Sequence, residues 1–339
     1  SSKQNNGNIT HGMRANGTKN TGAGVAVYDG TFIMYGGKIS NNASRGVDVN
    51  GGTFTMYGGE ISGNTYTDNP NYNYGGGAGV RVRDFDTVQG NFAMYGGEIS
   101  NNTYKGGGDG GGVYASGTGK FIIQDGKITD NHCINTLVGA YGGGLYISGA
   151  HSELRIENST ISNNTCDGEG GGIFIGGDAT GSITDCTISG NNATGKSSKG
   201  GGLAFQNSTF TLEKCTITGN KTAGKGGGIF VLDNTANLTL SSDLKFSGNQ
   251  DNYPADESGN LTTGTANDVF LHTGAYLRLD STFSRATSTA PIVVTTYFTP
   301  SDNSYKKIAV DNRTTPDPTD FKYGNDSNSA IGIIAKTNN

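Results

Sequence analysis

The 339-residue chain has no tryptophan and contains only seven glutamates, thirteen leucines and six prolines. Helical domains use glutamate and leucine heavily and avoid glycine, whereas glycine supplies 58 residues here. These numbers exclude a helical bundle or a doubly wound α/β domain. Leu, Ile, Val and Phe make up only about 19% of the chain, but a net charge of −5 argues against disorder. The few apolar residues must therefore form a thin, regular core.

Charge and long apolar runs are also scarce. With 24 Lys and Arg residues and a net charge of −5, the chain lacks the positive field that nucleic acid requires. No apolar run approaches the ~18 residues of a membrane helix, and no apolar signal segment opens the chain. We expect neither a nucleic-acid partner nor membrane insertion. Four cysteines are too few for a disulfide-built scaffold.

One short pattern recurs eight times, and every copy ends on an asparagine. An apolar anchor (Ile in seven copies, Phe246 in the eighth) is followed by Ser or Thr, then by Gly, Asn or Asp, and then by the asparagine. Gly, Asn and Asp tolerate left-handed backbone, so each copy predicts a sharp corner. Stacked side chains at such a corner can hydrogen-bond to one another. We predict an inward-facing asparagine ladder of Asn42, Asn64, Asn102, Asn131, Asn164, Asn191, Asn220 and Asn249.

A second motif of glycines and a short apolar strand precedes each copy, from GAGVAV to GGGIFV. One repeat then comprises three short strands and three turns in as few as 22 residues, too short for a propeller blade of ~40–45 residues. The sequence predicts an all-β fold, a parallel β-helix of about nine three-strand coils, which the crossover rule makes right-handed.

The chain divides into three predicted parts. Residues 1–20 are a worn first coil or a partial N-terminal end, 21–280 the β-helix, and 281–339 a β-rich C-terminal cap where prolines replace glycines. The end of a β-helix is an exposed sheet edge that must be covered, and no amphipathic capping helix precedes it. We therefore expect the chain to be part of a longer one, or to be capped by a partner at its N-terminus.

The paired motifs resemble a known family. Gly-Gly-Gly-apolar followed by Phe/Ile-x-x-Asn, as in Phe246–Asn249 (FSGN), looks like the repeats of the polymorphic outer-membrane proteins, which are autotransporter adhesins. The variant MYGGEISGN is similar to repetitive right-handed β-helix proteins of bacterial cell surfaces. The resemblance covers roughly residues 20–280 and implies an extracellular location and adhesion, without specifying a ligand. We predict a non-catalytic extracellular structural or adhesin-like module of a bacterial surface protein, cell-surface or secreted, that binds a glycan or a protein of a host or another cell surface.

Aromatic residues supply the candidate binding site. The largest insertion (65–77) carries Tyr66, Tyr72 and Tyr74, and a row at the middle of the glycine strand contains Tyr114, Tyr146, Phe174 and Phe230. Insertions and outward rings are where we expect ligand contacts. The alternative is that loops or the C-terminal segment cover the row. Rings less than about a tenth exposed would then belong to internal packing.

An enzyme is the alternative function, since many β-helices are polysaccharide lyases or glycoside hydrolases that need paired carboxylates. Glu60 and Glu98 share a ladder, but Lys38 and Lys127 flank them, which is typical of alternating charge on a solvated face. We predict no catalytic residue, metal site or cofactor. A stack of Tyr35, Tyr57 and Tyr95 is interpreted as stabilising the sheet.

The four cysteines occupy matching positions in consecutive coils, Cys133 with Cys166 and Cys186 with Cys215. Stacked positions lie ~4.8 Å apart, within the ~4.4–6.8 Å that a disulfide spans. Two inter-coil disulfides are one interpretation, given an oxidising location. The other is that each cysteine is a small buried hydrophobic residue.

Overall fold

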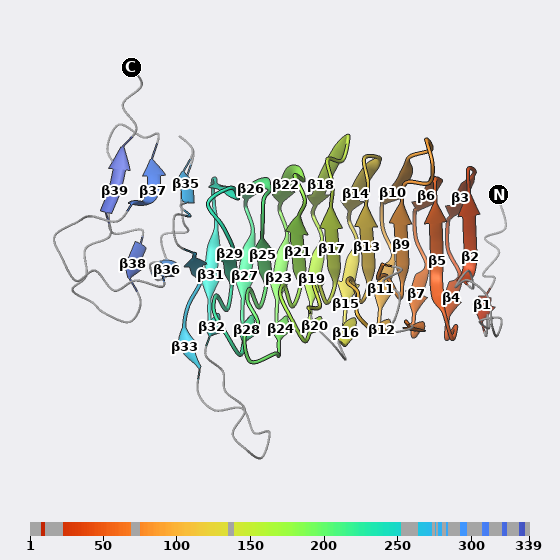
Figure 1. Cartoon of the computed structure of the whole chain (residues 1–339), viewed down its shortest axis with the longest axis horizontal. Helices are drawn as coiled ribbons and strands as arrows, with labels where there is room; N and C mark the ends of the chain where they lie inside the picture. Colours follow the sequence, from red (N-terminus) through yellow and green to blue (C-terminus); the bar gives the residue numbers. More distant parts are fainter. Residues whose placement is uncertain are drawn as a thin grey trace, which may run out of the picture.

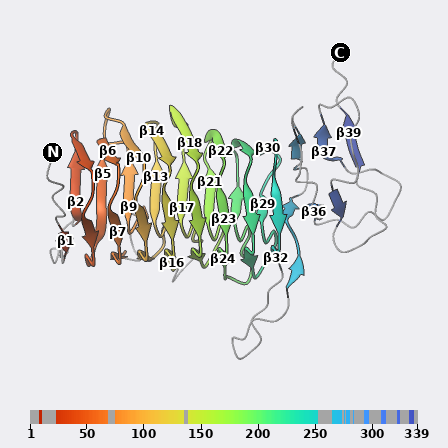
Figure 2. The same ribbon diagram turned by 180° about the vertical axis from the view of Figure 1, so that it is seen from behind.

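The computed structural model describes residues 8–10, 23–68, 75–134, 139–251, 264–272, 275, 277–279, 283, 292–296, 307–311, 321–323 and 332–335. Every regular element in these ranges is a β-strand, and the strands form four sheets. The strands of each sheet follow one another along the long axis of the molecule, in the order of the chain (Figures 1 and 2). The predicted parallel β-helix is confirmed.

Three of the sheets correspond to the three predicted strands of a coil. The strand-one sheet follows the glycine turns and contains β2 (Ala23–Tyr28), β5 (Arg45–Asn50), β9 (Val80–Arg83), β13 (Val113–Ser116), β17 (Leu145–Ser148), β21 (Ile173–Gly176), β25 (Leu203–Phe205), β29 (Ile229–Val231), β34 (Val269–Leu271), β36 (Ile292–Thr296) and β38 (Phe321–Tyr323). The strand-two sheet contains β3 (Thr31–Met34), β6 (Gly52–Met56), β10 (Gly90–Met94), β14 (Lys120–Gln124), β18 (Glu153–Glu157), β22 (Thr180–Thr184), β26 (Thr209–Glu213), β30 (Asn237–Leu240), β35 (Leu277–Leu279), β37 (Lys307–Asp311) and β39 (Gly332–Ala335). The strand-three sheet carries the anchors and contains β1 (Asn8–Thr10), β4 (Lys38–Ser40), β7 (Glu60–Ser62), β11 (Glu98–Ser100), β15 (Lys127–Thr129), β19 (Thr160–Ser162), β23 (Thr187–Ser189), β27 (Thr216–Thr218) and β31 (Lys245–Ser247).

A fourth sheet of very short strands follows the corner asparagines and was not predicted. It contains β8 (Thr65–Thr67), β12 (Thr103–Lys105), β16 (His132–Ile134), β20 (Thr165–Cys166), β24 (Asn192–Ala193), β28 (Lys221–Thr222), β32 (Gln250–Asp251) and β33 (Thr265–Ala266). These strands carry no fixed residue comparable to the anchor that marks the equally short strands of the strand-three sheet, so the sequence pattern did not reveal them. Within the described residues, seven coils (β5 to β32) carry all four strands, compared with about nine three-strand coils predicted.

Inward-facing side chains form one continuous core along the axis. The anchors stack in register, for example Ile61, Ile99 and Ile128, and all three are fully buried. Each buried side chain of this size contributes roughly 1.5–3 kcal/mol. A second, small core of Tyr66, Ala78, Tyr104, Cys133, Ala140 and Cys166 lies apart from it.

The eight corner asparagines are buried and hydrogen-bonded from coil to coil. Each Nδ2 donates to the Oδ1 of the next asparagine at 2.7–3.0 Å, and each backbone N–H donates to the same oxygen at 3.0–3.1 Å. The second Nδ2 proton of Asn64 through Asn249 goes to an anchor carbonyl of the preceding coil at 2.9–3.0 Å. Asn249 ends the run by donating to Asp268 Oδ1 at 2.9 Å.

The glycine motif and the asparagine motif depend on each other. A Cβ at Gly112 would lie 2.9 Å from the Asn131 amide, and one at Gly144 would lie 2.9 Å from the Asn164 amide. No real side chain tolerates these contacts, so the glycine is what admits the ladder. The residue that precedes a ladder asparagine has the predicted left-handed backbone, with φ of 55° at both Asn101 and Asp130.

Beyond the last complete coil, two sheets continue with parallel strands, and β33 adds one antiparallel strand to the fourth sheet. β34, β36 and β38 extend the strand-one sheet in parallel, and β35, β37 and β39 extend the strand-two sheet. The division of the chain at residues 20 and 280 stays a prediction.

Candidate functional site

The predicted insertion site does not present its described tyrosine to solvent. Tyr66 is 1% exposed, lies under the guanidinium of Arg45 at 3.7 Å, and stacks on Tyr104 at 5.7 Å. Its hydroxyl donates to Asp68 at 3.4 Å. Tyr66 is therefore part of the second core. Tyr72 and Tyr74 lie outside the described residues.

The two phenylalanines of the predicted aromatic row are covered, which corrects their assignment to an exposed surface, while its two tyrosines keep part of their surface open. Tyr114 and Tyr146 stack at 5.0 Å and are only partly exposed, while Phe174 is 4% exposed and Phe230 is fully buried. By the one-tenth criterion, the two phenylalanines belong to internal packing.

The cover consists of the residues that precede the glycine turns. Tyr141 packs on Phe174 with ring centroids 4.6 Å apart, and Lys199 lies 5.6 Å over the ring of Phe230. Glu169, one coil before Lys199, binds it in an ion pair of 2.7 Å. These residues differ in type from coil to coil, so the repeat pattern did not predict that they cover the row.

In the two preceding coils, the strand positions in register with Tyr114 hold a buried ion pair instead of aromatic rings. Arg81 pairs in register with Tyr114 and with Asp48, and it donates from Nε and Nη2 to both Asp48 oxygens at 2.7 Å. Burial alone would raise the pKa of Asp48, but the hydrogen bonds and charge of Arg81 outweigh it and the net pKa is lowered. The pair is structural because Asp48 is fully buried and Arg81 is 3% exposed.

Among the described residues that precede the glycine turns, Asp109 is the carboxyl whose pKa is strongly raised. Burial raises the pKa of Asp109 to about 7, opposed by a hydrogen bond from the Tyr141 backbone N–H. Its charge contributes to raising the pKa of Tyr146 above its usual range, after burial. Perturbed carboxyls mark functional sites in some proteins, but Asp109 precedes a glycine turn as Tyr141 and Glu169 do, so it belongs to the cover of the row.

The four cysteines are free thiols, and all four are buried. Cys133 and Cys166 are register partners, so the coil spacing was read correctly, but no disulfide joins either pair. A hydrogen bond to Cys166 and burial raise the pKa of the Cys133 thiol. The small-hydrophobe interpretation fits this arrangement.

Exposed apolar side chains gather instead in the first three coils. Of the six large ones in the described part of the chain, five lie there: Tyr28, Ile33, Tyr35, Tyr57 and Phe85, each 45–67% exposed. They lie on or beside β3, β6 and β9, at the N-terminal end of the solenoid (Figure 1). Elsewhere in the described residues, Ile134 is the single large apolar side chain exposed to a comparable degree, so this concentration is a candidate interaction surface.

Two of the exposed rings, Tyr35 and Tyr57, form a ladder with the half-buried Tyr95. Tyr35 and Tyr57 stack at 5.3 Å with an 8° interplanar angle, and Tyr57 and Tyr95 stack at 5.5 Å with 22°. Tyr35 is 67% and Tyr57 49% exposed. Sheet stabilisation accounts for the stacking, but it does not require rings so open to solvent.

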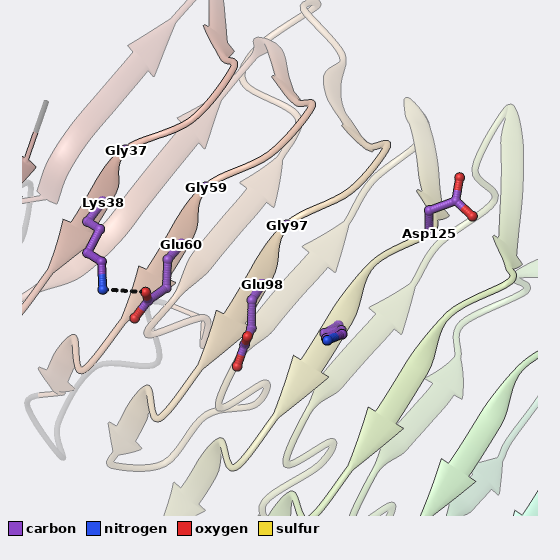
Figure 3. Close-up of a pocket in the computed structure, with 8 residues that line it drawn as sticks. Gly37, Lys38, Gly59, Glu60, Gly97, Glu98 and Asp125 are labelled. Carbon is purple, nitrogen blue, oxygen red and sulfur yellow. Dashed lines mark ion pairs between the residues drawn. The ribbon is translucent and has the colours of Figure 1, made fainter. Parts of the chain in front are cut away.

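A charged groove of about 520 Å³ lies across the glycine turn from these rings. Its side chains are Lys38, Glu60, Glu98, Asp125 and Lys127, and Figure 3 shows Lys38, Glu60 and Glu98 projecting to the same side of successive strands. Lys38 binds Glu60 at 2.6 Å. Hydrogen bonds from Lys38 and Ser62 lower the pKa of Glu60.

We call the ladder and the groove together the tyrosine edge: Tyr35, Tyr57, Tyr95, Lys38, Glu60, Glu98 and Lys127. The sequence showed both sets, but each was assigned to an ordinary structural role. The missed signal is the spacing Tyr-Gly-Gly-Lys/Glu in three coils, which places aromatic and charged side chains on the two sides of one turn.

Other kinds of site are not seen in the described ranges. There, no three His, Cys, Asp or Glu side chains converge to hold a metal ion. No helix in that part of the chain is long and apolar enough to cross a membrane.

The geometry defines a solenoid protein, a parallel β-helix with one edge rich in exposed tyrosine and charge. The chain belongs to the right-handed β-helix family: the model of a right handed beta helix region matches residues 76–269, more than half of the chain. The predicted handedness is thereby confirmed. Searches of curated proteins and of solved structures gave no match.

Proposed function

We propose that the chain is a non-catalytic, extracellular structural or adhesin-like module of a bacterial surface protein, and that the tyrosine edge is its binding surface. The observation that carries this proposal is the exposure of Tyr35 and Tyr57, which are 67% and 49% exposed. A partner that covers these rings removes apolar surface from water, which favours binding. The partner is a glycan or a protein on another cell surface.

The rigidity of the edge supports binding. Each ring is stacked on its neighbour, and the strands beneath pair in register from Phe54 with Phe92 to Met56 with Met94. Tyrosine offers a large contact area with few rotatable bonds, so little entropy is lost when a partner docks. The lysines and carboxylates beside the rings supply a polar rim, as interfaces commonly have.

A carbohydrate-active enzyme is the second candidate, because Glu60 and Glu98 are register partners in one groove. Glycoside hydrolysis needs one protonated carboxyl as general acid. The lowered pKa of Glu60 keeps that group ionised at neutral pH, which argues against the acid role. A turnover screen against pectin, alginate and chondroitin tests this candidate, and hydrolysis abolished by Glu98→Gln would establish it in place of the adhesin.

The adhesin proposal is tested with the double variant Tyr35→Ser, Tyr57→Ser in cell-binding and glycan-array assays. We expect binding to fall about tenfold or more while the melting temperature stays close to that of the wild type, because the rings are exposed. Gln124→Ser is the control, since Gln124 occupies the next position of the same ladder and carries no ring. Retained binding by the double variant contradicts the assignment.

A further inference from the structure

A second pair of exposed rings lies at the other end of β3 from the tyrosine edge. Tyr28, the last residue of β2, is 51% exposed, and Phe85, in the insertion between β9 and β10, is 54% exposed. Their centroids are 6.4 Å apart and their planes meet at 86°. Because the rings are perpendicular, they do not cover one another's faces as the stacked tyrosines do.

Phe85 is held in this exposed place by its backbone. Phe85 and Val88 exchange both backbone hydrogen bonds, at 2.9 and 3.0 Å, and close a tight turn. Asp86 within the turn is left-handed, with φ of 54°. The ring is therefore presented to solvent by a built turn and not by packing against the core.

A polar groove of about 720 Å³ starts at the residues that follow the two rings, Asp29 and Asp86, while the rings themselves are not part of its lining. Its lining contains three carboxylates, four threonine hydroxyls and two amides, and no lysine or arginine: Asp29, Asp84, Asp86, Thr31, Thr53, Thr87, Thr118, Gln89 and Asn91. The three carboxylates do not converge to hold a metal ion, and neither does any other group of three His, Cys, Asp or Glu side chains in the described residues.

The walls of the groove are fixed by hydrogen bonds. Asp84 Oδ1 accepts from the Gly90 N–H at 2.9 Å, and its Oδ2 accepts from the N–H and the hydroxyl of Thr118, both at 2.9 Å. Gln89 Nε2 donates to the Thr118 hydroxyl at 3.1 Å, and Asn91 Oδ1 accepts from the Lys120 N–H at 2.8 Å. A preorganised wall loses little entropy on binding.

The chemistry of this place selects the ligand. An exposed aromatic face packs on an apolar face, while carboxylates, amides and hydroxyls bind groups that both donate and accept hydrogen bonds. A pyranose ring offers both, with C–H groups on its face and hydroxyls around its rim. No lysine or arginine lines the groove, and its three carboxylates repel a uronate, sulfate or phosphate.

We propose that the Tyr28–Phe85 groove binds a neutral pyranose, as a second binding site distinct from the tyrosine edge. The strands β3 and β6 separate the two sites, so a branched or extended glycan reaching along a strand would contact both. This proposal does not depend on the tyrosine edge being a binding surface.

The test is saturation-transfer NMR and calorimetry with glucose, galactose, mannose and N-acetylglucosamine, and with glucuronate as the charged counterpart. We expect at least one neutral sugar to bind at millimolar concentration and glucuronate not to bind. Phe85→Ser should weaken that binding about tenfold or abolish it, with an unchanged melting temperature because the ring is exposed. Ile134→Ser, which removes an exposed apolar side chain outside both sites, is the matched control and should bind the sugar like the wild type. Tyr57→Ser is measured beside it to separate this site from the tyrosine edge.

Three results would overturn the proposal. The first is wild-type protein that binds none of the neutral sugars, and the second is a Phe85→Ser variant that binds them unchanged. The third is sugar binding lost only in Tyr57→Ser, which would place the sugar at the tyrosine edge. Failure of the tyrosine-edge variants in cell binding, with Phe85-dependent sugar binding intact, would refute the proposed adhesive surface and leave this site standing.

Discussion

Asn131→Ala is the sharpest test of what holds the coils together. Asn131 is fully buried and makes four side-chain hydrogen bonds: from Nδ2 to Ile99 O and Asn164 Oδ1, and at Oδ1 from the backbone N–H and the Nδ2 of Asn102. Alanine removes all four and leaves the Asn102 N–H without its acceptor inside the protein. At a net ~1 kcal/mol per bond, with a penalty for the orphaned group, the free energy of unfolding falls by about 3–5 kcal/mol.

Thermal denaturation followed by circular dichroism measures this loss. With an unfolding entropy of ~2.1 cal/mol/K per residue, the melting temperature of the 339-residue chain drops by about 4–7 °C. Asp130→Gly is the control, because Asp130 sits one residue earlier at φ 55° and Gly63 occupies the same corner position in another coil. We expect this control to change stability by less than about 1 kcal/mol. An Asn131→Ala protein with the melting temperature of the wild type would refute the stabilising role assigned to the ladder.

Two further predictions concern buried charge. Arg81→Met leaves Asp48 unpaired and should cost about 3–5 kcal/mol at pH 7 in urea denaturation. Because Arg81 lowers the pKa of Asp48, the stability that the wild-type pair contributes is complete above the unfolded pKa of ~3.9 and is lost as the pH falls from that value through the lowered folded pKa. The deficit of the variant should therefore shrink below pH ~4, and a deficit independent of pH would contradict this account. For Asp109, whose pKa burial raises to about 7, ionisation costs stability as the pH rises from ~4 through 7, so Asp109→Asn should stabilise the protein by about 1–3 kcal/mol at pH 8 and by little at pH 4. Equal effects at both pH values would refute the assignment.

Most of the fold could be predicted from the repeat, because the backbone restricts which residues can occupy the corner, anchor and glycine positions. Asn131 must accept and donate in a fixed geometry, and Gly112 must leave room for it, so both recur in every coil. The fourth strands were missed because a strand such as Thr165–Cys166 imposes no residue type.

The candidate site was harder to predict because exposure depends on what lies above a side chain. The outward row including Phe230 could be placed in its column, but its cover comes from side chains such as Lys199 that precede the glycine turns and do not repeat. The tyrosine edge was visible in the sequence, but stacking and ligand binding use the same tyrosines, and only the 67% exposure of Tyr35 separates the two roles.

The sheets also set how the solenoid resists being pulled along its length. Backbone hydrogen bonds between coils run along the axis, so tension loads each coil interface in series and the weakest interface sets the breaking force. Among the described strands, interfaces between complete coils carry four parallel ladders, whereas beyond β32 only those of the strand-one and strand-two sheets continue. Within the described residues, a pulled chain should therefore yield first at its ends, near the Asn249–Asp268 contact or where β1 is joined by a single ladder to β4, while the seven complete coils between them stay intact.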